Sequence, residues 1–159
     1  MKRSPHLRKL GPSDLAAPFL RLAMGVGLVS AVADRLGFWG PPGAAMVSWG
    51  NFHNFLAYTA KLNPWCPGAC LPLLGVVVTI AEAGLGMLLI LGISSRLAAL
   101  LTGVMTLAFA AAMTLVLGVH APLIYSVFPF SAASFLLASQ PPDELSIDNL
   151  RELKSSRKE

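Results

Sequence analysis

The chain has 159 residues, of which 55% are hydrophobic and 13% are charged, with a mean hydropathy of +0.65. This composition excludes an ordinary soluble domain and is typical of a single polytopic membrane domain. The net charge is +4, but the basic residues gather at the two ends of the chain, which indicates cytoplasmic flanks of membrane helices rather than a nucleic-acid interface.

Four hydrophobic segments are long enough to cross a bilayer, at about 20 residues per crossing. They cover about residues 15–38, 71–91, 96–117 and 121–138. The third, after Arg96, and the fourth lie in a stretch without Asp, Glu, Lys or Arg, from Leu97 to Pro142, and Gly118–Pro122 supplies the turn between them. Pro122 and Pro129 weaken the fourth segment as a helix.

Four crossings place both ends of the chain on one side of the membrane. The tails, residues 1–14 and 139–159, are basic, so the positive-inside rule predicts that both are cytoplasmic. A cleaved signal peptide at the first segment is the alternative, but Arg21 would interrupt its apolar region.

The outer loop, residues 39–70, contains all three Trp residues of the chain. Apolar residues recur in it at helical spacing from Met46 through Trp49, Phe52 and Phe55 to Thr59. This spacing predicts an amphipathic helix lying at the membrane interface between the first two spans. Its role is either that of a structural anchor or that of a lid over a ligand entrance.

Small residues at a spacing of four predict how the spans pack, because close backbone approach drives helix association in lipid. These stripes are Ala23, Gly27 and Ala31 in the first span, Gly75, Thr79 and Ala83 in the second, and Ala98, Thr102, Thr106, Ala110 and Thr114 in the third. We therefore expect an all-α fold, an antiparallel four-helix bundle in the membrane.

Several segments resemble the DoxX family in combination. They are Arg21–Gly25, Ser30–Gly37, Trp39–Gly43, Val47–Phe52, Tyr58–Thr59, Leu62–Pro64, and Glu82 followed by Gly92 and Arg96. The resemblance covers most of a domain at residues 15–138. It implies a small four-helix protein of the bacterial inner membrane, and some members are subunits of thiosulfate:quinone oxidoreductases or of thiol and oxidative-stress complexes. It supplies no catalytic set.

Glu82 is the main candidate for chemistry, because a carboxylate near the middle of a membrane span is costly unless it is paired, protonated or hydrated. We expect Arg21 as its partner, with Arg96 at the mouth of the same side, forming a polar site within the bundle. A structural ion pair and a proton-handling or ligand-binding role both remain open.

A second polar site is predicted at the outer end of the first span. It comprises Asp34, Arg35 and His53, with Lys61 nearby. The alternative is that Asp34 acts as a clamp that ties the outer loop to the helix end.

Cys66 and Cys70 lie at the outer edge of the second span. A structural disulfide, a redox-active pair and two free thiols are all possible, although the three-residue separation differs from the C-x2-C motif of thiol oxidoreductases. With His6, His53 and His120 they form no recognised metal-binding pattern.

The sequence contains no phosphate-binding loop, nucleophile elbow or haem-attachment motif, so we expect at most an oxidoreductase subunit. We predict a subunit or accessory of a quinone- or thiol-linked redox system that binds a hydrophobic small molecule, with a quinone as candidate cofactor. Expected partners are the bilayer and a redox protein or second copy, without nucleic acid. The alternatives are a non-catalytic scaffold or assembly factor, and a thiol-quinone oxidoreductase that uses Cys66 and Cys70.

Overall fold

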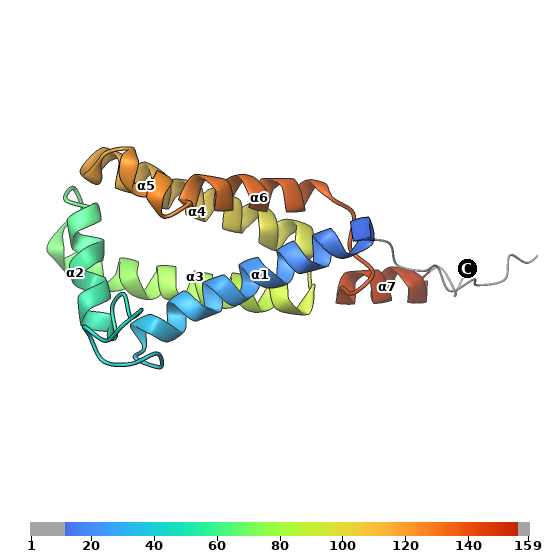
Figure 1. Ribbon diagram of the computed structural model, residues 1–159, viewed down its shortest axis with the longest axis horizontal. Helices are drawn as coiled ribbons and strands as arrows, with labels where there is room; N and C mark the ends of the chain where they lie inside the picture. The colour runs from blue at the N-terminus through green and yellow to red at the C-terminus, as the bar shows by residue number, and fades with distance from the viewer. Residues whose placement is uncertain (1–11, 156–159) are drawn as a thin grey trace, which may run out of the picture.

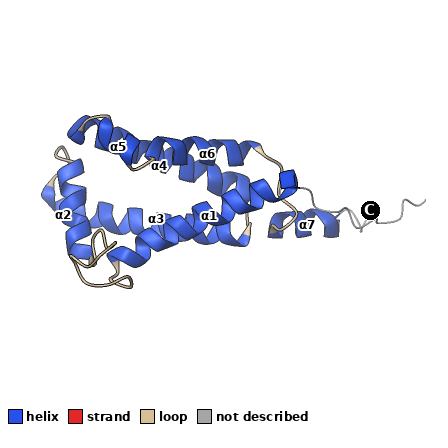
Figure 2. Ribbon diagram, viewed as in Figure 1, coloured by secondary structure: helices blue, strands red, loops and turns tan. Residues whose placement is uncertain are grey.

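The computed structural model describes residues 12–155, so most of the predicted N-terminal tail, including His6, lies outside the described residues. The described chain is helical, and Figure 2 shows no strand in this part. The elements are α1 (Pro12–Arg35), α2 (Phe52–Leu62), the short 3-10 helix η1 (Gly68–Cys70), α3 (Leu71–Leu91), α4 (Ser95–Leu117), α5 (His120–Ile124), α6 (Val127–Ser139) and α7 (Ile147–Ser155).

Within residues 12–155, three helices are long and apolar enough to cross a membrane. They correspond to Leu15–Arg35, Gly68–Leu91 and Ser95–Leu117, with mean hydropathies of 1.8, 2.3 and 2.2. Large apolar side chains such as Phe19, Ile80 and Leu115 are exposed on them, as expected for surfaces that face lipid. The all-α class and the membrane character expected from the sequence are confirmed.

The fourth predicted span, residues 121–138, is not one helix. The structure divides it into α5 and α6, because the chain turns at Tyr125–Ser126 and Ser126 has a left-handed backbone with φ +54°. Pro122 and Pro129 each lie in the first turn of one of these helices, where the missing N–H is tolerated. The apolar helix α6 has 13 residues and so is about 20 Å long, shorter than a bilayer core.

The helices form two main pairs, α1 with α3 and α4 with α6 (Figure 1). The two pairs meet near the α3–α4 turn and diverge toward the opposite end, where α2 lies across the gap between them. The start of α1 lies at the same end of the molecule as α7 (Figure 1).

Glycines set the closest approach of α1 to α3. A Cβ on Gly25 would lie 2.8 Å from the carbonyl oxygen of Gly86, and a Cβ on Gly86 would lie 3.0 Å from that of Gly25. The stripe predicted for the first span is wrong in this respect, because Ala23 and Gly27 are exposed. The contact is made by Gly25, which lies on a different face of α1 from the predicted stripe.

The stripe predicted for the third span is mostly buried in the structure. Its members Ala98, Thr102, Thr106 and Ala110 are at most 5% exposed. On the neighbouring helix, the Ser131 hydroxyl donates a 2.8 Å hydrogen bond to the carbonyl of Gly103. Small and hydroxyl-bearing residues therefore bring α4 and α6 close together.

The outer loop differs from the expected helix. Helix α2 begins only at Phe52, because the side chain of Asn51 caps it by accepting a 2.8 Å hydrogen bond from the Asn54 amide. Met46 is 99% exposed with φ +63°, so it is not part of an apolar helix face. Gly50, two residues before α2, packs directly on the backbone of Pro42. Its φ of +66° breaks the helical pattern before Phe52.

Candidate functional site

A cavity of about 980 Å³ occupies the end of the molecule where the two helix pairs diverge. The packed apolar core, which includes Leu28, Leu89 and Leu137, lies nearer the other end. The cavity walls come from the end of α1, the loop before α2, helices α2, α3 and α4, and the α5–α6 turn; they include Arg35, Trp49, Phe55, Tyr58, Leu74, Val78, Glu82, Met105, Phe109, Ala112, Met113 and Tyr125. Its lining is thus largely apolar, with a few polar side chains.

An ion pair between Arg35 and Glu82 forms the polar part of the cavity wall. Nη2 of Arg35 lies 2.5 Å from Oε2 of Glu82, and both side chains are at least nine-tenths buried. Nη1 of Arg35 also donates a 3.1 Å hydrogen bond to the hydroxyl of Thr79, which lies one helical turn before Glu82 on α3. The pair therefore joins the end of α1 to the middle of α3.

Two aromatic rings cover the guanidinium group of Arg35. Its central carbon lies 3.9 Å from the ring centre of Phe55 and 5.3 Å from that of Trp49. These rings pack edge to face, with centres 5.5 Å apart. Cation–π attraction and exclusion of water hold the charge in an otherwise apolar environment.

The Glu82 carboxylate keeps acceptor capacity beyond its ion pair. Oε2 contacts Nη2 of Arg35 and has no other hydrogen-bond partner within residues 12–155. Since Glu82 lines the cavity, its carboxylate supplies a hydrogen-bond acceptor at the cavity surface.

Tyr58 supplies a potential donor in the same cavity. Burial raises the pKa of its hydroxyl above 10, and the neighbouring Tyr125 raises it further, so the group remains protonated at neutral pH. Tyr58 is not among the site residues predicted from the sequence. The sequence signal that would have indicated Tyr58 is its helical spacing from Phe55, Thr59 and Leu62. These four residues lie on the face of α2 that lines the cavity.

Asp34 acts as the clamp considered above. Its carboxylate accepts hydrogen bonds from the backbone amides of Ser48, Trp49 and Gly50, at 2.9, 3.2 and 3.2 Å. These bonds hold Trp49 over Arg35. The outer site predicted from Asp34, Arg35 and His53 is not assembled, because His53 is exposed on α2 and does not line the cavity.

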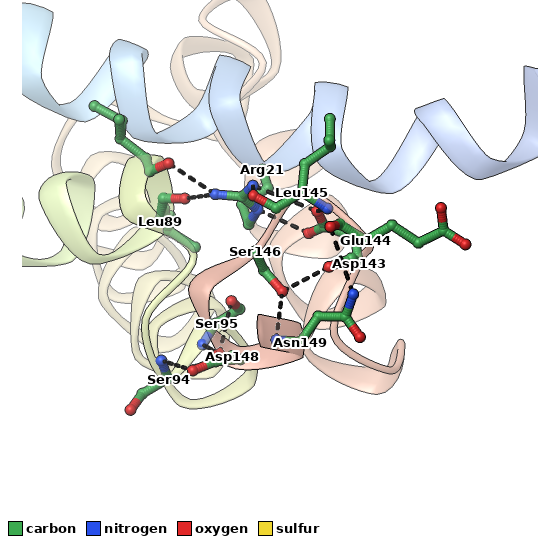
Figure 3. Close-up of polar contacts among 11 residues, drawn as sticks. Arg21, Leu89, Ser94, Ser95, Asp143, Glu144, Leu145, Ser146, Asp148 and Asn149 are labelled. Atoms are coloured by element: carbon green, nitrogen blue, oxygen red, sulfur yellow. Dashed lines mark hydrogen bonds and ion pairs between the residues drawn. The ribbon is translucent and has the colours of Figure 1, made fainter. Parts of the chain in front are cut away.

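Arg21 lies away from the cavity, in a polar cluster with the segment before α7 (Figure 3). Its Nε lies 2.8 Å from Oδ2 of Asp143, and its guanidinium also donates to the carbonyls of Leu89, Ile90 and Leu145. Arg21 therefore fastens the segment before α7 to the end of α3. In the same cluster, Asp148 accepts hydrogen bonds from the backbone amides that begin α4 (Figure 3).

The predicted site of Glu82, Arg21 and Arg96 is wrong as a cluster. Arg21 is level with Leu89, which lies about 10 Å along α3 from Glu82, whereas Arg35 is level with Glu82 itself. Arg96 is exposed and donates a 3.2 Å hydrogen bond to the Ala138 carbonyl at the end of α6. The antiparallel register of α1 and α3 separates the three residues.

Cys66 and Cys70 are free thiols, half-buried and exposed respectively. Neither of them lines the cavity. Within the described residues, no group of three or more His, Cys, Asp or Glu side chains is arranged to hold a metal ion.

Comparisons of the chain with protein-family models, curated proteins and solved structures give no match.

Proposed function

We propose that this chain is a membrane protein that binds an apolar small molecule with a hydrogen-bonding head group. A quinone or quinol is the candidate ligand, and the protein acts as a subunit or accessory of a quinone- or thiol-linked redox system. The observation that carries this proposal is the buried Arg35–Glu82 pair on the wall of a largely apolar cavity.

The polar groups of the cavity complement such a head group. The Glu82 carboxylate is an acceptor for a quinol hydroxyl, and the Tyr58 hydroxyl is a donor for a quinone carbonyl. The aromatic and aliphatic walls, including Phe109 and Met113, accommodate a ring. The cavity volume of about 980 Å³ lies at the upper end of the range for small-molecule sites, about 300–1,000 Å³.

The membrane setting supports an apolar ligand. The walls formed by α3 and α4 belong to two of the helices long enough to cross a bilayer, so a molecule dissolved in lipid can reach the cavity from the side. In the proposed topology α5 and α6 together form the fourth crossing, and both tails lie in the cytoplasm of a bacterium. The start of α1 and helix α7 lie at the same end of the molecule, which supports placing both tails on one side of the membrane (Figure 1).

The resemblance to the DoxX family supports the redox context. Four of the residues that carry it, Arg35, Trp49, Tyr58 and Glu82, line the cavity. The proposal concerns binding, and it assigns no electron-transfer step to this chain.

Tryptophan fluorescence tests the proposal. Replacing Trp39 and Trp65 by Phe leaves Trp49, which lines the cavity, as the sole Trp of the chain. Decylubiquinone is titrated into this variant in quinone-free nanodiscs. We expect saturable quenching of Trp49 fluorescence, because quinone rings quench indole on contact.

Two variants on α4 provide the controls. Ala112→Phe fills the cavity from its wall and should abolish the saturable quenching, whereas Leu115→Phe adds bulk at a residue that is 76% exposed and should preserve it. Quenching that rises linearly with quinone and is identical in all three proteins would refute binding in the cavity.

A further inference from the structure

A second hollow lies between α3 and α4, nearer the end where these helices are joined. It has a volume of about 480 Å³, and it is lined only by glycine and residues with apolar side chains. We call it the α3–α4 groove, defined by Ile80, Gly84 and Leu88 on α3 and Leu101, Val104 and Met105 on α4.

The groove follows from how the helices are paired. Helix α3 packs mainly along α1 and α4 along α6, so the faces of α3 and α4 between the two pairs are incompletely filled. Gly84 deepens the groove, because a Cβ at this position would meet no atom within 4 Å. From Ile80 to Leu88 the groove extends about 12 Å along α3.

The groove adjoins the cavity. Met105 lines both, and on α3 the groove residue Ile80 lies between the cavity residues Val78 and Glu82. A molecule whose head group contacts Glu82 can therefore extend past Met105 into the groove without leaving the protein surface.

We propose that the ligand of the cavity carries a hydrocarbon tail, and that this tail lies in the α3–α4 groove. This inference rests on the proposed function and specifies its ligand class as a long-chain amphiphile with a small uncharged head group, such as a ring with an alkyl or isoprenoid chain.

The depth of Glu82 in the membrane favours this class of ligand over an ordinary phospholipid. Glu82 lies near the middle of α3, Leu71–Leu91, and the groove continues from there toward the α3–α4 turn. A phospholipid in this position would have its charged phosphate at mid-membrane depth, where the loss of hydration is prohibitive. A quinone-like ring loses far less hydration on entering the same site.

Two probes that differ only in the tail test this inference. They are decylubiquinone and its tail-less ring, 2,3-dimethoxy-5-methylbenzoquinone, each titrated against the sole-Trp49 protein in nanodiscs. In the variant Gly84→Leu a side chain occupies the groove but not the cavity. We expect it to weaken decylubiquinone binding at least about tenfold and to leave the affinity of the tail-less ring unchanged.

The affinity of each probe is compared between the parent protein and the variant, so differences in membrane partitioning between the two probes cancel. Val77→Leu is the matched control, since Val77 is exposed on α3 and lines neither hollow, and it should change neither affinity. An unchanged affinity for decylubiquinone in Gly84→Leu, or an equal loss for both probes, would overturn the tail assignment. If neither probe gives saturable quenching in the parent protein, the proposed function itself fails.

Discussion

Arg35 connects three parts of the molecule through one side chain. It is 1% exposed, pairs with Glu82 of α3, and lies against the rings of Trp49 and Phe55. A buried ion pair contributes little net stability compared with apolar residues of the same size, but loss of one partner leaves an uncompensated charge. A stabilising role and a ligand-binding role for the pair therefore make different predictions.

Variants of the pair separate these two roles. Glu82→Leu should lower the free energy of unfolding by about 3–5 kcal/mol, because Arg35 remains buried without its partner. The double variant Arg35→Met/Glu82→Leu should recover most of this loss, yet neither protein should bind decylubiquinone tightly. Thermal unfolding in detergent and Trp49 quenching measure the two effects. Tight binding by the folded double variant would show that the pair has no role in the site.

Asp34 positions the loop that carries Trp49. Its three hydrogen bonds come from consecutive backbone amides, and hydrogen bonds to a charged group contribute about 1.5–3 kcal/mol each. Asp34→Ala should lower stability by at least about 2 kcal/mol and expose residues 36–51 to protease. Limited proteolysis followed by mass spectrometry checks this, with exposed His53→Ala as the control. Equal cleavage rates in both variants would contradict the clamp.

At the scale of helices, the contact between α1 and α3 depends on two glycines that face each other. Gly25→Leu would force its Cβ against the backbone of Gly86 and should separate the helices, with a strong loss of thermal stability. Gly84→Ala, on the groove side of α3, has open space around it and should be neutral or slightly stabilising. Circular-dichroism melting curves distinguish these outcomes, and similar melting temperatures for the two variants would contradict the proposed contact.

The sequence predicts individual helices well where hydrophobicity alone defines them. Helices α3 and α4 differ by at most one residue from the predicted spans 71–91 and 96–117, since Gly92 with φ +67° ends α3 between two strongly apolar stretches. The left-handed turn at Ser126 has no such signal, because Ser rarely adopts it, and the division into α5 and α6 was missed.

The candidate site was predictable only in part. Glu82 was evident as a charge within an apolar span, but its partner depends on the register between α1 and α3, which no local pattern contains. Both Arg21 and Arg35 lie on the buried face of α1, and only the packing at Gly25 decides which of them reaches Glu82. The cavity itself arises from the divergence of helix pairs, a property of the assembled fold.

At the scale of the whole molecule, the two helix pairs are packed together at one end and diverge at the other. The Arg21–Asp143 cluster and the apolar core hold the helices together near α7, while α2 lies over the cavity at the far end. The long apolar helices α1, α3 and α4 run between these ends, so in a bilayer the two ends face opposite aqueous compartments.

The proposed topology, with both tails in the cytoplasm, predicts where thiols can be labelled. In sealed bacterial cells, a membrane-impermeant maleimide should modify the native Cys66 and Cys70, which lie next to the start of α3. A cysteine placed at Gln140, after α6, in a background with both native cysteines replaced by Ser should react only after the membrane is opened. Labelling of both positions from the same side would contradict an even number of crossings.

The most direct test of the central claim is native mass spectrometry of the full chain extracted gently from its own membranes. We predict a bound apolar molecule at about one copy per chain in the parent protein and in Leu115→Phe, and its loss in the cavity-filling variant Ala112→Phe. Equal amounts of bound molecule in Ala112→Phe and Leu115→Phe, or none in the parent protein, would contradict the account.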